Sequence, residues 1–181
     1  RNVCLMGHGG DGKTSLAEAM LFAAKATDRL GKIADGNTVC DFEPEEIKRK
    51  VSISTALAPL EWKDCKINLI DTPGYFDFVG EAMQGLRAAD AVIILVNGKA
   101  SVEVGTEKAV KYANTRMLPK IFFVSRLDEE NTDFYKVFAD LKEAFGVKVC
   151  PVEVPVIDGG KVVGYLNLIT MKAKACTPQG A

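Results

Sequence analysis

Eight residues near the start of the chain have the spacing G-x-x-x-x-G-K-[ST], which is typical of a loop that binds phosphate groups. They are Gly7, His8, Gly9, Gly10, Asp11, Gly12, Lys13 and Thr14. We expect these residues and Ser15, which follows them, to bind the nucleotide. In such a loop the backbone N–H groups and the start of the next helix surround phosphate oxygens. We expect Lys13 to contact the β- and γ-phosphates and Thr14 to bind Mg²⁺ through its hydroxyl. The alternative is a plain glycine-rich turn. His8 itself is expected to be only a loop residue.

A second candidate site follows the apolar stretch 67–70. Asp71 comes directly after this stretch, where a carboxylate is needed beside the Mg²⁺ of a bound nucleotide. With the three residues that follow, it has the form D-x-x-G. Gly74 lacks a side chain, so its backbone N–H can approach a γ-phosphate closely. Taken alone, these four residues are only a good turn, but their place after a phosphate loop favours a metal and phosphate site.

A third candidate site follows the apolar run 121–124. GTP-binding proteins carry N-K-x-D at the similar place, where the Asp accepts two hydrogen bonds from guanine. Of these residues only the Asp is retained here, as Asp128, and Arg126 can stack on a base through its guanidinium plane. Ser125 stands where the Asn would bind the base edge, and its side chain is shorter. We expect all three residues to contribute to nucleotide binding, with a helix cap over 125–128 as the alternative.

Alternating strands and helices are predicted to position these sites. The predicted strands are 2–6, 51–60, 66–70, 91–96, 121–124, 147–154 and 161–169. The predicted helices are 15–25, 79–88, 103–116 and 132–145. Strands 51–60 and 66–70 are expected to form an antiparallel hairpin through Lys63 and Asp64, and the last ten residues carry no strong element. The pattern predicts an α/β fold with a mostly parallel P-loop NTPase sheet, helices on both faces and one antiparallel edge strand. Ligands of such sheets bind at the carboxyl ends of the strands.

The overall composition narrows the class of protein. The 181-residue chain is 48% apolar and 26% charged, the balance of an ordinary globular domain. Its 23 basic and 24 acidic residues give a net charge of −1, which argues against a general binder of DNA or membrane surfaces. No apolar run approaches the roughly 18 residues of a membrane span. Five widely spaced cysteines without a C-x-x-C pair predict buried thiols in a reducing cytoplasm, with a disulfide frame or zinc site as the alternative.

In their order along the chain, the three sites resemble those of the amino-terminal GTPase domain of bacterial elongation factor G and its paralogues. The resemblance covers almost the whole chain and is carried by residues 7–14, 71–78, 102–104 and 126–134. Residues 49–54 are similar to the R-G-I-T-I-T of that family's first switch, whose threonine hydroxyl binds Mg²⁺ when GTP is present. Ser52 falls on that threonine, so the resemblance implies Thr14, Ser52 and Asp71 as Mg²⁺ ligands. The alternative is that the charged stretch 43–50 is only a solvated face.

Two departures from the family separate this chain from the housekeeping factor: one is Tyr75, and the other is the replacement of the Asn and Lys of N-K-x-D by Ser125 and Arg126. The family writes D-T-P-G-H, with a histidine that places the attacking water on the ribosome, and Tyr75 stands there instead. A phenol keeps its proton at neutral pH and is no ready base. The resemblance implies Tyr75, Gly74 and Lys13 as catalytic residues, and hydrolysis is expected to be slow because Tyr75 replaces the histidine. In addition, the family's S-A motif behind the base is missing, because no serine follows Ser125.

The domain organisation follows from the same resemblance. We expect a P-loop GTPase domain over 1–150 and the beginning of an inserted subdomain over 151–181, so that the chain is a piece of a longer protein. In the family the missing S-A motif lies beyond that insertion.

Three functions are compatible with these residues. The first is a GTPase module of a translation factor, which binds GTP or GDP with Mg²⁺ and changes conformation on the ribosome. The second is a guanine-nucleotide switch that does not hydrolyse GTP, favoured by Tyr75 and by the altered base site. The third is a P-loop ATPase or small-molecule kinase, which Lys13, Thr14 and Asp71 permit.

Overall fold

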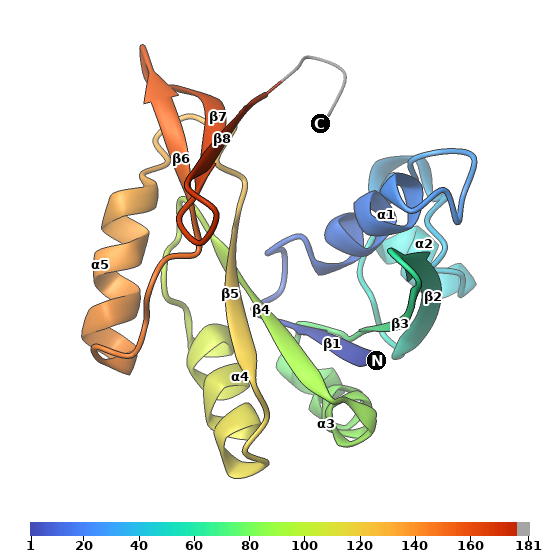
Figure 1. Ribbon diagram of the computed structural model, residues 1–181. Coiled ribbons are helices and arrows are strands. Elements are labelled where there is room, and N and C mark those ends of the chain that lie inside the picture. Colours follow the sequence, from blue (N-terminus) through green and yellow to red (C-terminus); the bar gives the residue numbers. More distant parts are fainter. Residues whose placement is uncertain (177–181) are drawn as a thin grey trace. The chain divides into compact units, whose positions relative to one another are not determined.

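The computed structural model describes residues 1–176 (Figure 1). These residues form two compact units, one made of 1–96 with 103–123 and the other of 97–102 with the chain from 124 onward. The phosphate loop lies in the first unit, and the third candidate site, 125–128, lies in the second. No helix among the described residues is long and apolar enough to span a membrane.

A five-stranded sheet has the strand order β2-β3-β1-β4-β5. Its strands are β1 (Asn2–Met6), β2 (Ala56–Trp62), β3 (Cys65–Asp71), β4 (Ala91–Asn97) and β5 (Lys120–Ser125). β1 lies parallel to both β3 and β4, whereas β2 pairs antiparallel with β3 at the edge of the sheet. The predicted α/β fold, with a mostly parallel sheet and one antiparallel edge strand, is therefore confirmed.

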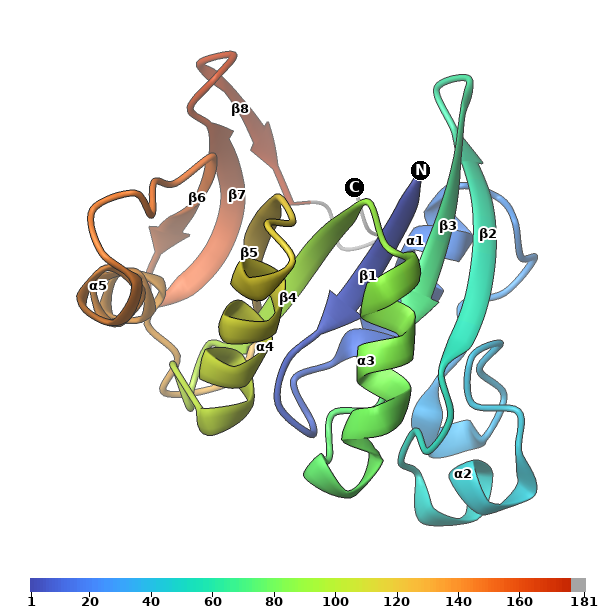
Figure 2. The ribbon, with the colours of Figure 1, turned by 90° about the horizontal axis from the view of Figure 1, so that it is seen from below.

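Helices cover the two faces of this sheet. They are α1 (Lys13–Ala23), α3 (Val79–Ala88) and α4 (Val104–Thr115). The first unit also contains the short helix α2 (Pro44–Arg49) and the single 3₁₀ turns η1 (Ile33–Asp35) and η2 (Phe76–Phe78). Figure 2 shows α1 behind β1 and β3, and α3 and α4 in front. The core beneath α1 contains Ala17 and Leu21 of the helix and Leu5, Leu69 and Leu95 of the three central strands. Strands covered on both faces need apolar residues on both, which explains their apolar runs.

The segment before β2 differs from the prediction. The hairpin turn is confirmed, because Lys63 and Asp64 both have positive φ, 48° and 62°, which matches the twist of two-residue hairpins. The strand predicted from residue 51 begins only at Ala56, since the backbone of 51–55 is bound by side chains of helices rather than by a neighbouring strand. The charged stretch 43–50 contains helix α2, with a proline in its first turn.

The second unit consists of a helix and a three-stranded antiparallel sheet. These elements are α5 (Phe134–Phe145), β6 (Glu153–Asp158), β7 (Lys161–Asn167) and β8 (Lys172–Ala175). β6 and β7 form an antiparallel hairpin, with Gly159 and Gly160 as its turn. Two predictions were wrong: the strand expected from residue 147 begins at Glu153, and β8 forms where no strong element was expected. β8 is exposed at every residue and carries only small alanines as apolar side chains, so it forms through backbone pairing with β7.

The cysteines agree only in part with the predicted buried thiols. All five are free, which matches the expectation against a disulfide frame. Cys4 and Cys40 are buried, but Cys65, Cys150 and Cys176 are exposed, because they lie at a hairpin end and in the second unit outside its core.

Candidate functional site

The phosphate loop connects β1 to α1 and is closed by its own side chains. Gly12 precedes the helix with φ 91°, and it carries no side-chain oxygen that would compete for the first N–H groups of α1. The Asp11 carboxylate accepts a hydrogen bond from the backbone N–H of His8 at 2.7 Å. The Lys13 ammonium donates to the carbonyl of His8 at 2.7 Å and to that of Gly7 at 3.3 Å. A helix N-terminus and a cation thus face the same loop, which is the arrangement that binds an anion.

Burial shifts the titration of three charged groups here. Desolvation lowers the pKa of Lys13, and it raises the pKa of Asp11 to about 6 and that of Asp71 to about 7. Each shift reflects the cost of a charge removed from water. A phosphate beside Lys13 and a cation beside Asp71 would each favour the charged form, so the site is suited to bind both.

The three residues predicted as Mg²⁺ ligands come together from three different segments. The Thr14 hydroxyl, at the start of α1, donates to the Asp71 carboxylate at the end of β3, at 2.7 Å. The Ser52 hydroxyl lies 3.1 Å from the Thr14 hydroxyl. The second carboxylate oxygen of Asp71 is buried and has no hydrogen-bond partner in the described part of the chain. Two hydroxyls and a carboxylate with a spare buried oxygen are hard donors, so these residues fit Mg²⁺.

The described residues contain no cluster of side chains that could hold a metal ion by themselves. Within 1–176, no group of three or more His, Cys, Asp and Glu side chains lies close enough to hold a metal ion. A cation at Thr14, Ser52 and Asp71 would therefore need further oxygen ligands, which phosphates and water supply to Mg²⁺.

The segment after β3 lies directly on the phosphate loop. A Cβ atom added to Gly74 would stand 2.7 Å from the His8 carbonyl oxygen and 2.8 Å from the Gly9 backbone nitrogen, and would also meet the Lys13 ammonium. A Cβ atom on Gly9 would come within 3.0 Å of the Tyr75 ring. The three residues predicted to be catalytic, Lys13, Gly74 and Tyr75, are thus brought to the same loop.

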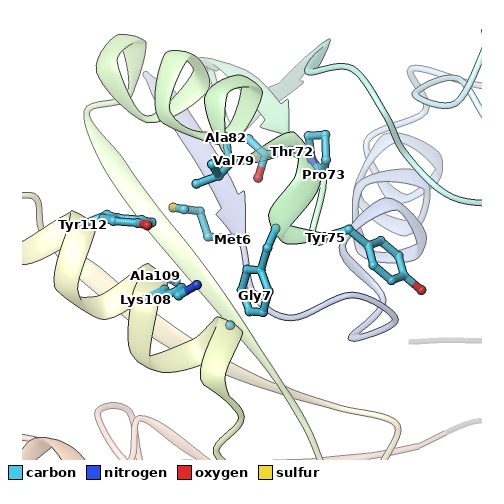
Figure 3. Close-up of a pocket in the computed structure, with 13 residues that line it drawn as sticks. Met6, Gly7, Thr72, Pro73, Tyr75, Val79, Ala82, Lys108, Ala109 and Tyr112 are labelled. Atoms are coloured by element: carbon cyan, nitrogen blue, oxygen red, sulfur yellow. The ribbon is translucent and has the colours of Figure 1, made fainter.

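Tyr75 and the residue after it point in different directions. Figure 3 shows the Tyr75 ring directed away from the cavity that Met6, Val79 and Tyr112 line. The Tyr75 side chain is 47% exposed. The Phe76 ring instead lies under the Lys108 ammonium, 3.7 Å from the ring centroid. The cavity measures about 30 Å³, enough for a water molecule and too small for a nucleotide.

His8 has specific neighbours, so its interpretation as only a loop residue was incomplete. Its ring meets the edge of Phe76 with 5.8 Å between centroids, and its Nε2 lies 3.7 Å from a Glu103 carboxylate oxygen. Gly105 at the start of α4 approaches it so closely that a Cβ there would stand 2.6 Å from the His8 Cα. These contacts connect the phosphate loop to α4.

The third candidate site forms a tight turn after β5 in the second unit. The Ser125 carbonyl accepts a hydrogen bond from the Gly98 N–H at 2.9 Å, which holds the start of the turn. Arg126 has φ 57°, and its guanidinium pairs with the Glu129 carboxylate at 2.8 Å. Asp128 is exposed. An exposed ion pair contributes little stability, so this pair is a weak obstacle to stacking of Arg126 on a base.

Sequence reasoning missed three acidic side chains beside the site: Asp41, Glu46 and Glu81. Asp41 is buried near Ser52 and Lys13, and burial raises the pKa of its carboxyl. Glu46 is fully buried and binds the backbone next to Ser52. The Glu81 carboxylate accepts a hydrogen bond from the backbone N–H of Thr55. Only Glu46 had a local signal, since an acid three residues into a helix is typical of a capping box.

Comparison with known proteins identifies the family. Residues 1–176 match the model of the elongation factor Tu GTP binding domain. The chain belongs to this family. It is therefore a GTP-binding domain of the translation-factor type, and binding of guanine nucleotides is the property that the family shares.

Individual relatives agree with the expected resemblance. The chain is 37% identical over 170 residues to a mitochondrial ribosome-releasing factor 2 of Culex quinquefasciatus, covering 94% of this chain and 23% of that protein. It is 39% identical over 167 residues to an elongation factor G-like protein of Mycobacterium tuberculosis, covering 92% of this chain and 23% of that protein. A crystal structure of a Thermus thermophilus protein superimposes with a TM-score of 0.94 at 38% identity, over 98% of this chain and 27% of that one.

These figures confirm the resemblance to elongation factor G and its paralogues. They also show that the chain spans about a quarter of the length of these relatives. An ATPase or kinase finds no support among them.

Proposed function

We propose that this chain is the guanine-nucleotide module of an elongation factor G-like translation factor, which binds GTP with Mg²⁺, hydrolyses it slowly and changes conformation on the ribosome. The observation that carries the proposal is the meeting of Thr14, Ser52 and Asp71 within hydrogen-bonding distance beside Lys13. Three segments distant in sequence supply these groups, and a plain glycine-rich turn has no need of them. The predicted domain boundary near residue 150 and the cytoplasmic location belong to the same proposal.

Each residue has a definite task in this mechanism. Lys13 would exchange its contacts with the loop carbonyls for the β- and γ-phosphate oxygens. Thr14, Ser52 and Asp71 would hold Mg²⁺, whose charge offsets the negative charge on the phosphate oxygens. The N–H of Gly74 would reach the γ-phosphate because no side chain separates this segment from the loop. Release of phosphate would then free both the Ser52 segment and the Gly74 segment.

Tyr75 supports slow hydrolysis. Its ring already lies at Gly9 of the phosphate loop, and its phenol oxygen can accept a hydrogen bond from a water molecule without serving as a base. Phosphoryl transfer depends mainly on positioning and charge stabilisation, so the lack of a base slows the reaction without abolishing it. A non-hydrolysing switch is the second candidate, because the same observation permits it.

Single-turnover hydrolysis of GTP, with and without saturating ribosomes, separates the two candidates. The protein that carries this chain should show very slow intrinsic turnover that ribosomes stimulate, less strongly than in a histidine-bearing factor. Binding of GTP without turnover in either condition would favour the non-hydrolysing switch. Absence of GTP binding would contradict both.

A further inference from the structure

A buried residue outside the phosphate site, Glu46, holds the backbone after Ser52 with its carboxylate and the backbone before Ser52 with its carbonyl. Glu46 of α2 is fully buried, and one of its carboxylate oxygens accepts hydrogen bonds from the N–H groups of Ile53 and Ser54, both at 2.9 Å. The backbone carbonyl of Glu46 accepts from the Val51 N–H at 3.2 Å. A single residue thus binds the residues immediately before and after Ser52.

Because the Glu46 carboxylate is buried, its charge depends on these hydrogen bonds. A carboxylate removed from water requires partners, and in the described residues none of the ion pairs involves Glu46. Its second oxygen accepts from the Glu43 N–H at 3.1 Å. The charge is therefore stabilised by three backbone N–H groups, and two of these belong to the Ser52 segment.

The far end of the segment is held in the same manner. The Glu81 carboxylate of α3 accepts from the Thr55 N–H at 2.9 Å, and the Thr55 hydroxyl donates to the Glu81 carbonyl at 2.9 Å. Residues 51–55, which have no strand partner, are thus tied to α2 at one end and to α3 at the other. The Ser52 hydroxyl reaches Thr14 from this tethered backbone.

We propose that Glu46 is a positioning residue for the Mg²⁺-bound triphosphate state: it fixes the backbone around Ser52 so that the serine hydroxyl stays beside Thr14 and Asp71. This inference rests on the proposed function. Glu46 touches neither nucleotide nor metal and acts only through Ser52. Loss of the Glu46 side chain should therefore lower the affinity for GTP, whose Mg²⁺ would be held in part by Ser52. The affinity for GDP should not change.

The test compares GTP and GDP affinities of the protein that carries this chain, over a titration of Mg²⁺. Glu46→Ala should reduce the preference for GTP over GDP about tenfold and raise the Mg²⁺ concentration needed for half-maximal GTP binding, with GDP affinity unchanged. Glu46→Gln keeps an oxygen that accepts from Ile53 and Ser54, so it should restore most of the preference. Glu45→Gln, on the exposed face of the same helix, is the matched control and should behave as the unaltered protein.

A double-mutant cycle with Ser52→Ala shows whether Glu46 acts through the serine. In that background Glu46→Ala should have no further effect on GTP. An unchanged GTP preference in Glu46→Ala, an equal loss of GTP and GDP, or full additivity with Ser52→Ala would overturn the inference while the proposed function stands. Failure of the unaltered protein to bind GTP would overturn both. If Glu46→Ala does not fold, Glu46→Asp replaces it in the test. Its side chain is one methylene shorter, so the same loss of GTP preference is expected.

Discussion

Replacement of Gly74 by alanine tests the close approach between the β3 segment and the phosphate loop. The new Cβ would stand 2.7 Å from the His8 carbonyl oxygen and 2.8 Å from the Gly9 nitrogen, both backbone atoms that cannot rotate away. Overpacking of this kind costs about 1–3 kcal/mol unless the structure moves. One of the two segments must therefore shift.

The phosphate loop is the more firmly held of the two. Asp11 and Lys13 bind it from within, whereas Tyr75 after Gly74 is exposed. We expect the Gly74 segment to move away from the loop. The Gly74 N–H would then lose its contact with the γ-phosphate. GTP affinity should fall by about 5- to 150-fold, the range that corresponds to about 1–3 kcal/mol. GDP has no γ-phosphate, and its affinity should stay within about twofold.

Calorimetric titration of both nucleotides, with Gly80→Ala as the control, provides the measurement. A Cβ at Gly80 meets no atom within 4 Å, and this position is exposed on α3. Gly80→Ala should leave both affinities unchanged and stabilise the fold by about 0.5–1 kcal/mol. If Gly74→Ala binds GTP as tightly as the unaltered protein, or if both variants lose GTP equally, the steric reasoning is wrong.

Three further predictions concern the base site, hydrolysis and helix α5. Ser125→Asn should tighten GDP by about one neutral hydrogen bond, roughly 0.5–1.5 kcal/mol, in a titration of the full protein, and no gain would remove this position from base recognition. Tyr75→His should raise ribosome-stimulated turnover in single-turnover assays with little change in GTP affinity; an unchanged rate in Tyr75→Phe would show that the phenol oxygen does not set the rate. Asp133 caps α5 by accepting from the N–H groups of Tyr135 and Lys136 at 2.9 and 3.2 Å. Asp133→Ala should therefore lower the free energy of unfolding by about 1 kcal/mol in chemical denaturation, and equal stability would contradict the capping role.

Local patterns were sufficient where local forces decide the structure. The strand predicted at 2–6 and the helix predicted at 79–88 have the observed bounds. The strand is a short apolar run that stops at the glycine cluster beginning with Gly7. Helix α1 begins at Lys13, two residues before the predicted start, since Gly12 already provides its N-terminal boundary. The order of motifs was likewise enough to identify the family.

Contacts between distant segments could not be predicted in this way. Residues 51–55 include β-branched side chains that favour a strand, but their N–H groups bind the carboxylates of Glu46 and Glu81 instead of a neighbouring strand. The approach of Tyr75 to Gly9 joins residues separated by most of the first unit. No periodicity in the sequence encodes such pairs, so the residues that position Ser52 emerged only from the fold.

Calorimetric titration of GDP with Mg²⁺ tests the central claim, that this chain forms a guanine-nucleotide site around Lys13. Lys13→Ala should weaken GDP by about 1.5–3 kcal/mol, because it removes a charge-assisted contact to phosphate. Lys48→Ala, on the exposed surface of α2, should leave the affinity unchanged, and ADP should compete poorly with GDP. Equal GDP affinity in Lys13→Ala, or equal competition by ADP and GDP, would contradict the account.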